Sequence, residues 1–385
     1  MQDLASERSF LGETLELPPQ QTRLEEFWSQ LRKNRLALAG LIIFGLFFLL
    51  AVVGMLLTTG TSPVLDPSLV RLQEKLLPPL SGPNLKSLLP EEVPPLRVYL
   101  LGTDELGRDV FARMLQGAWV SLTVGFVAVG LAVIIGVFLG GLSGYYGQSY
   151  IRLGQVVLVL LTIWGAVGWS RLSGVYLVGI AVLALFVIVA MSIRRREGSS
   201  RPFSLLDAQL LSVDAIITSL IDIMLCFPSF FLILTVVALL PASIYNIMIV
   251  IGLTSWMGAA RFVRAEFLSL REQDFVTAAK ALGVSDWRII FRHMVPNAIA
   301  PVLVSATIGI AGAILTEAGL SFLGFGVPPP HATWGNILSD GKNYLFDAPW
   351  LTIIPGVAIL VVVLSFNLFG EGLRDILNPK LRERH

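Results

Sequence analysis

The sequence predicts an all-α protein that crosses a membrane several times, and three features predict it. Of the 385 residues, 55% are hydrophobic and only 14% are charged, whereas soluble domains carry about 25% charged residues. Long stretches contain no charged side chain at all. The 28 Lys and Arg residues nearly cancel the 27 Asp and Glu residues. This balance of charge predicts that the protein has no nucleic-acid partner. These features do not fit a purely water-soluble enzyme.

Eight segments are predicted to span the membrane. A spanning helix needs about 20 apolar residues, because each residue advances about 1.5 Å through a hydrocarbon core of about 30 Å. Residues 215–240 qualify despite Asp222 and Pro228, since interior packing can satisfy a polar group and a broken helix. Residues 153–170 form a shorter span. The other six contain no Asp, Glu, Lys or Arg: 36–57, 118–140, 172–193, 241–260, 294–316 and 348–370.

Basic residues beside the first and last spans predict that both termini are cytoplasmic. They are Arg23, Arg32, Lys33 and Arg35 before the first span, and Arg374, Lys380, Arg382 and Arg384 after the last. If both termini lie on the same side of the membrane, the number of spans must be even. The eight predicted spans meet this condition. The first run has no small-residue cleavage site and is predicted to be an uncleaved anchor. The predicted parts are a tail (1–35), a first helix (36–57), an external loop (58–117), a helical domain (118–372) and a tail (373–385).

One cytoplasmic segment, between the spans 241–260 and 294–316, is amphipathic. Apolar residues recur at helical spacing from 271 to 282, and Gly283 follows where a left-handed helix cap is expected. Ser285 and Asp286 are typical of the start of a second helix, which is predicted to run to Met294. This helix, glycine corner and helix could be a docking projection. The alternative is a segment lying on the membrane interface, anchored by its aromatic side chains.

The segment DFVTAAKALGVSDWRIIFRHMVPN resembles the EAA loop of binding-protein-dependent ABC importer permeases. The motif positions read Thr277, Ala278, Ala279, Gly283, His293, Val295 and Pro296, and four of the seven match with the spacing intact. Three further stretches resemble the second-permease (C-type) subfamily of the dipeptide, oligopeptide and nickel branch: LGTDELGRDVFARMLQGAWVSLTVG, LTEAGLSFLGFGVPPPHATWGNIL and FNLFGEGLRDILNPKLR. The resemblance covers residues 25–147 and 213–382.

This resemblance implies a type I ABC importer transmembrane fold in a prokaryotic cytoplasmic (inner) membrane. The family core has six helices, whereas this chain carries an extra hairpin, about 148–212, expected outside the transport path. The implied partners are a second homologous permease, two cytoplasmic ATPase subunits and an external solute-binding protein. The chain lacks a G-x-x-x-x-G-K-[ST] phosphate loop. ATP and Mg²⁺ are therefore expected on the ATPase subunits, with no cofactor on this chain.

The resemblance also implies site residues. Those expected to couple to the ATPases are Thr277, Ala278, Ala279, Leu282, Gly283, Asp286, Arg288, Arg292 and Pro296. Asp222, Glu317 and Asn367 are candidates for the path or a gate, because polar groups inside spans are costly. Each has a plainer alternative: a structural hydrogen bond or interfacial ion pair for Asp222, a solvated interfacial acid for Glu317, and helix packing for Asn367.

Two functions of other classes remain open from the residues. Gly141-Leu142-Ser143-Gly144 has the form found at the nucleophile of intramembrane serine proteases, but no histidine lies within a span to activate the serine. A stand-alone channel or secondary transporter would need more embedded charge than Asp222. His293, His331 and His385 are too scattered for a metal site. For the importer, peptides are the expected substrates, with nickel complexes or glutathione as alternatives.

Overall fold

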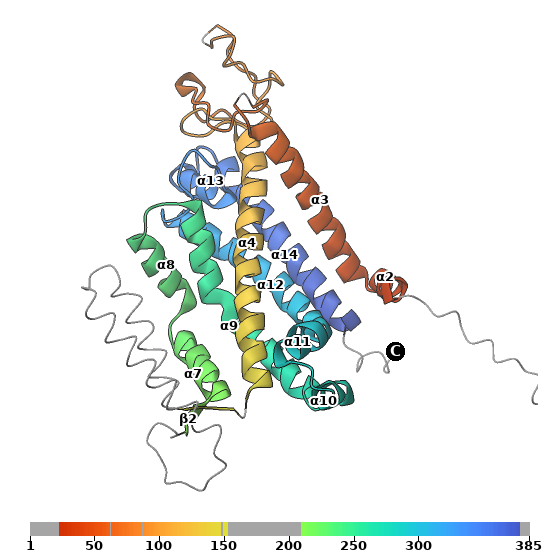
Figure 1. The fold of residues 1–385 in the computed structure, drawn as a ribbon. Coiled ribbons are helices and arrows are strands. Elements are labelled where there is room, and N and C mark those ends of the chain that lie inside the picture. Colours follow the sequence, from red (N-terminus) through yellow and green to blue (C-terminus); the bar gives the residue numbers. More distant parts are fainter. Residues whose placement is uncertain (1–22, 62, 87, 148, 153–208, 378–385) are drawn as a thin grey trace, which may run out of the picture.

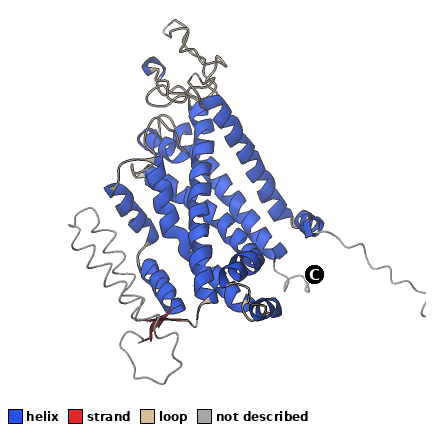
Figure 2. Cartoon of the chain, viewed as in Figure 1, coloured by secondary structure: helices blue, strands red, loops and turns tan. Residues whose placement is uncertain are grey.

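The computed structural model describes residues 23–61, 63–86, 88–147, 149–152 and 209–377, and it shows a bundle of long helices with loops at both ends (Figures 1 and 2). The elements are α2 (Arg23–Lys33), α3 (Arg35–Thr58), η1 (Leu72–Glu74), α4 (Val110–Tyr145), β1 (Tyr150–Arg152), β2 (Gln209–Ser212), α7 (Val213–Cys226), α8 (Ser229–Leu239), α9 (Ile244–Leu270), α10 (Asp274–Ala281), α11 (Asp286–Arg288), η3 (Ile289–Met294), α12 (Val295–Phe322), α13 (Trp334–Gly341), η4 (Lys342–Tyr344) and α14 (Trp350–Leu377).

Within the described residues, five helices are long and apolar enough to cross a membrane, and the bent pair α7–α8 makes a sixth. The five are α3, α4, α9, α14 and the continuous run from Asp286 to Phe322. Each of the six overlaps one predicted span. The predicted spans 153–170 and 172–193 lie outside the described residues. The described residues contain a helical candidate for each of the other six spans.

The described chain begins and finishes at the same end of the bundle. The helices α2, α10 and α11 lie at that end with the carboxyl end of α14, and it is called the terminal end here (Figure 1). The segment 59–109 and α13 lie at the opposite, loop end (Figure 1). Six alternating crossings, counting α7–α8 as one, give this arrangement.

The predicted span 215–240 is broken in the middle. Its two halves, α7 and α8, meet at 83° around Phe227 and Pro228. Proline has no backbone N–H and forces the preceding residue out of the helical region. Phe227 accordingly has extended angles, with φ −91° and ψ 134°. The break turns α8 away from the axis of α7.

Two helices extend beyond the predicted segments. The helix α4 begins at Val110, eight residues before the predicted span 118–140, because the Asp109 side chain caps it by accepting from the Phe111 N–H at 2.8 Å. Residues 110–117 of the predicted loop are therefore helical. The predicted stop near Met294 is also absent, since a π-helical turn over Ile289–Met294 carries α11 directly into α12. Pro296 lies in the first turn of α12, directly after this π-helical turn.

A two-stranded antiparallel ladder lies at the terminal end between α4 and α7. Tyr150 pairs with Ser212 and Ile151 with Leu211. The ladder brings together the two places where residues 153–208 leave and rejoin the described bundle. The inserted segment therefore starts and finishes beside the same short sheet.

The helices α4 and α9 pack closely along their length through glycines at four-residue spacing. A Cβ atom at Gly136 would lie 2.6 Å from the Ala259 Cβ, and one at Gly140 would meet the Ala260 carbonyl. One more turn along, Gly144 faces the Phe267 side chain. Small residues at this spacing let helix backbones approach closely in lipid, where dispersion contacts replace the hydrophobic effect. The row Gly136, Gly140 and Gly144 is called the glycine seam.

We expect Gly140→Ala to destabilise the protein, because its Cβ has no space against the backbone of α9. Overpacking of this kind costs about 1–3 kcal/mol. Gly130→Ala is the matched control on the same helix, since nothing lies within 4 Å of its added Cβ. Thermal unfolding of the two purified variants checks this. Equal midpoints for both variants would contradict a tight seam.

Candidate docking site

The segment from α10 to η3 forms a projection at the terminal end, and Gly283 forms its corner. Gly283 has φ +74°, as the predicted left-handed cap requires. The Val284 N–H donates to the Ala279 carbonyl at 3.1 Å, and the Gly283 N–H donates to the Lys280 carbonyl at 3.0 Å. This pair of bonds is the Schellman motif, which ends one helix and redirects the chain. Ser285 occupies the next N-cap without a side-chain capping bond.

The inner face of the projection is held by apolar packing. Val276, Ile289 and Met294 are fully buried, and they cluster with Val263 and Phe267 of α9. Ala279 is also buried, with 8% of its surface exposed. Of the adjacent alanines, only Ala278 is therefore open to a partner, while Ala279 holds the corner against the bundle.

Asp286 ties the projection to the end of α4. Its carboxylate accepts from the Tyr145 hydroxyl at 2.6 Å and from the Tyr146 hydroxyl at 3.1 Å. Burial, followed by the hydrogen bond to Asp286, raises the pKa of Tyr146 above its usual value. The hydroxyl therefore remains a donor at neutral pH. Lys280 adds a cation–π contact, with Nζ 4.9 Å from the centre of the Tyr145 ring.

The outer face of the projection is open. Leu282 is 83% exposed at the tip, an unusual position for a large apolar side chain. Thr277, Ala278 and Gly283 are exposed around it. Arg288 and Arg292 are also exposed, and neither makes an ion pair with a described residue. An apolar tip with free cations beside it is a surface suited to a protein groove with an acidic rim.

The aromatic side chains of the segment lie together on a separate flank. Trp287 stacks on Phe291 at 5.5 Å and on Phe138 of α4 at 6.3 Å. All three rings are between 44% and 52% exposed. The interfacial alternative thus has a structural basis on this flank, while the tip at Leu282 stands apart from it.

A second polar contact joins three helices near the projection. The Arg264 guanidinium of α9 makes two bonds to the Asp214 carboxylate of α7, at 2.5 and 2.6 Å. The buried Ser143 hydroxyl of α4 donates to the same carboxylate. Ser143 was the candidate protease nucleophile, but its hydroxyl serves here as a packing contact to a carboxylate already paired with arginine.

The three path candidates lie apart from one another. Asp222 of α7 accepts from Arg261 of α9 at 2.8 Å, and both side chains are more than half exposed. Asn367 is half-buried on α14. Glu317 of α12 is fully buried, so the solvated-acid alternative was wrong; its carboxyl group meets the Ser321 hydroxyl at 2.7 Å and the Ser121 hydroxyl at 3.4 Å. No group of three metal-ligating acids, histidines or cysteines occurs among the described residues.

Sequence reasoning missed a charged network at the loop end. Asp104 is fully buried and pairs with Arg108 at 2.7 Å and with Arg113 of α4 at 2.5 Å. Both arginines also reach Asp340 of α13, at 3.2 and 2.9 Å. The alternating charges of GTDELGRDVFAR were the available signal. The network ties the segment 59–109 to α4 and α13, at the end of the bundle opposite the projection.

This fold defines a class of protein: a multi-pass membrane protein with a loop segment held by ion pairs at one end of the bundle and an exposed helical projection at the other. Residues 208–383 match the family described as "Binding-protein-dependent transport system inner membrane component", and residues 22–79 match the "N-terminal TM domain of oligopeptide transport permease C".

Relatives match most of the chain. A dipeptide transport system permease protein of Alkalihalophilus pseudofirmus is 36% identical over 93% of this chain and 90% of its own length. An oligopeptide transport system permease protein of Bacillus subtilis is 31% identical over 91% of this chain and 88% of its own. Among solved structures, the MetNI methionine ABC transporter matches 70% of this chain and 98% of its own at a TM-score of 0.40 and 15% identity.

The chain belongs to the family of inner membrane components of binding-protein-dependent transport systems. It is therefore a transmembrane permease subunit of an ABC importer, a transport component of the inner membrane and not an enzyme.

Asp104→Asn is expected to loosen the loop end, because it leaves two arginines facing one remaining acid. Breaking a buried ion pair costs about 3–5 kcal/mol. Glu272→Gln is the control, since Glu272 is 72% exposed in its pair with Arg271, and exposed pairs contribute about 1 kcal/mol at most. Thermal unfolding with limited proteolysis of residues 59–109 measures both. If the network did not stabilise the loop end, both variants would show the same small shift in unfolding temperature.

Proposed function

We propose that this permease imports short peptides, with energy supplied by ATPase subunits that dock on the projection. The observation that carries the proposal is the exposed Leu282 tip on a projection packed rigidly onto α4 and α9. The peptide substrate is supported by the relatives, which are named dipeptide and oligopeptide permeases.

The proposed docking surface is the exposed part of the projection: Thr277, Ala278, Leu282, Gly283, Asp286, Arg288 and Arg292. Leu282 would enter an apolar groove of an ATPase subunit, and the two arginines would meet its acidic rim. Ala279 does not face the partner, because it packs the corner of the projection against the bundle. Pro296 lies in the first turn of α12, which follows the projection. Exposed apolar anchors with a polar rim are typical of protein interfaces.

The proposed coupling passes through packed helices. ATP favours the closed pair of ATPase subunits, so ATP binding shifts the permease towards the state that the closed pair binds better. The projection transmits the movement because Val276 and Ile289 are buried against α9 and Asp286 is bonded to α4. The glycine seam then keeps α4 and α9 together as they move.

The complete assembly contains a second, homologous permease, two ATPases and an external binding protein. Both termini are cytoplasmic, and the full chain has eight spans, including the pair predicted within 148–212. The β1–β2 ladder supports an insert added to a complete six-span core, because the insert leaves and rejoins the bundle at one point. The insert is proposed to lie outside the transport path. Three polar groups are proposed for the transport path. Asp222 and Arg261 form an ion pair there, and Asn367 of α14 lines the path. Glu317 holds the external end of α12 through its hydrogen bond with Ser321.

Leu282→Arg should release the ATPase subunits without unfolding the permease, because the side chain is already solvent-exposed. Loss of a central apolar anchor typically costs 2 kcal/mol or more, roughly a thirtyfold loss of affinity. Phe346→Arg is the control: Phe346 is 95% exposed and lies beyond η4, near the loop end. ATPase subunits are quantified after affinity purification. Full retention by Leu282→Arg, or equal loss in both variants, would refute the docking surface.

Peptide transport is tested with the assembled importer in vesicles. Uptake of a labelled dipeptide should require ATP and should be competed by other short peptides, but not by nickel ions or glutathione. ATP-driven uptake of nickel or glutathione in place of peptide would contradict the proposed peptide substrate, but it would still agree with an ATP-driven importer. Uptake that survives ATP depletion would instead favour a channel or secondary transporter.

A further inference from the structure

The amphipathic helix α2 lies where the chain enters the membrane. It ends at Lys33, and α3 begins at Arg35, with the Asn34 side chain accepting from the Ala37 N–H at 3.1 Å as the helix cap. Figure 1 shows α2 at the foot of α3, at the terminal end of the bundle. Because α3 is a membrane-crossing helix, α2 lies at the level of the lipid headgroups.

One face of α2 is packed against protein. Leu31 is fully buried and Phe27 lies beside it, in a cluster with Ala37, Leu41, Phe369 and Ile376 of α3 and α14. This packing fixes the rotation of α2 about its axis. The residues on its other faces are therefore held in set directions.

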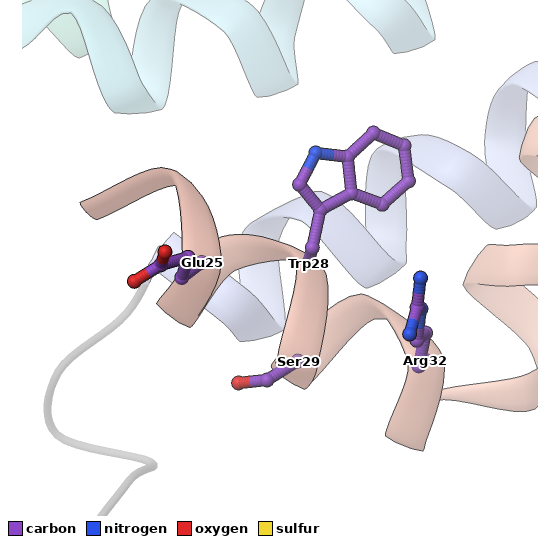
Figure 3. A pocket seen from close by; sticks show the side chains of 4 residues that line it. All are labelled: Glu25, Trp28, Ser29 and Arg32. Atoms are coloured by element: carbon purple, nitrogen blue, oxygen red, sulfur yellow. The ribbon is translucent and has the colours of Figure 1, made fainter. Parts of the chain in front are cut away.

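A second face of α2 forms an open groove of about 470 Å³, lined by Glu25, Trp28, Ser29 and Arg32. These residues follow i, i+3, i+4 and i+7 spacing, so they share one side of the helix. Figure 3 shows Trp28 and Arg32 projecting in the same direction from successive turns. Trp28 is 48% exposed although it adjoins the packed face. A half-exposed tryptophan next to an arginine is typical of side chains at a membrane interface.

The charges around the groove favour an anion. Arg32, Lys33 and Arg35 are exposed and none makes an ion pair within the described part of the chain. Glu25 is the groove's acid, and it lies seven residues from Arg32, about 10 Å along the helix axis. Arg32 is therefore the cation of the groove itself, and a phosphate beside it would lie about two helical turns from the carboxylate.

The membrane-crossing helix that follows α2 exposes aliphatic side chains. Leu36 is 65% exposed and Ile42 is 54% exposed on α3, directly after the basic residues. Exposed cations, an indole and an aliphatic helix therefore lie close together in the chain, and these are the groups that suit the phosphate, glycerol region and acyl chain of a phospholipid.

We propose that the Trp28–Arg32 face of α2 is a binding site for an anionic phospholipid. The Arg32 guanidinium binds the phosphate, Trp28 packs at the glycerol level, and the acyl chain lies along α3. The lipid holds α2 in the interface and so fixes the entry of α3. This site is independent of the transported substrate and of the docking projection.

The test compares two charge removals one residue apart. The full-length chain is purified in detergent, and binding of phosphatidylglycerol and of phosphatidylcholine is titrated by native mass spectrometry. Arg32→Gln should weaken phosphatidylglycerol binding about tenfold, as expected for losing a hydrogen bond to a charged group. Lys33→Gln removes the same charge outside the groove and should leave most of the binding intact. Circular dichroism checks that both variants keep their helix content.

Two results would overturn the site. Equal weakening by Arg32→Gln and Lys33→Gln would mean that diffuse charge, not the groove, attracts the lipid. Equal binding of phosphatidylglycerol and phosphatidylcholine by the wild-type chain would mean that α2 does not select an anion, and the groove would then belong to a protein partner. Neither result alters the peptide uptake or ATPase docking experiments.

Discussion

Close packing of α4 on α9 is the constraint on which the rest of the structure depends. The glycine seam lets the two backbones meet where side chains would hold them apart. The seam ends at Phe267, a buried residue that also forms the floor of the projection. Asp286 completes the connection by bonding the two tyrosines at the end of α4. The projection is thus the end of a helix pair and not a separate loop, so force applied at Leu282 acts on both helices.

Local patterns in the sequence predicted the features that depend on local physics. Apolar length predicted the spans, because lipid requires every backbone group to bond within its own helix. Gly283 predicted the corner, since a positive φ strains any residue with a side chain. The basic residues beside the first and last spans predicted that the two termini lie on one side, and α2 and the carboxyl end of α14 do lie at one end of the bundle (Figure 1). The inserted pair of spans stays a prediction, because it lies outside the described residues.

The remaining features depend on contacts between distant residues. Asp104 and Asp340 are far apart in the sequence, so no spacing rule could place both against Arg113. The same holds for Ala279, which belongs to a motif expected to be exposed but packs inward because α9 lies behind it. Glu317 shows the opposite error, since the partners that allow its burial come from α4 and from its own next turn. The π-helical turn at Ile289–Met294 likewise joined two helices that the sequence separated.

The most direct test of rigid coupling is a distance within the working importer. Cys226 is the single cysteine, so Cys226→Ser gives a background for spin labels at Gln273→Cys beside α10 and Val127→Cys on α4, both exposed positions. Pulsed electron paramagnetic resonance then measures the separation in the assembled complex with and without ATP. The account predicts one narrow distance that ATP leaves unchanged. A distance that shifts or broadens with ATP would show that the projection moves against α4, which contradicts it.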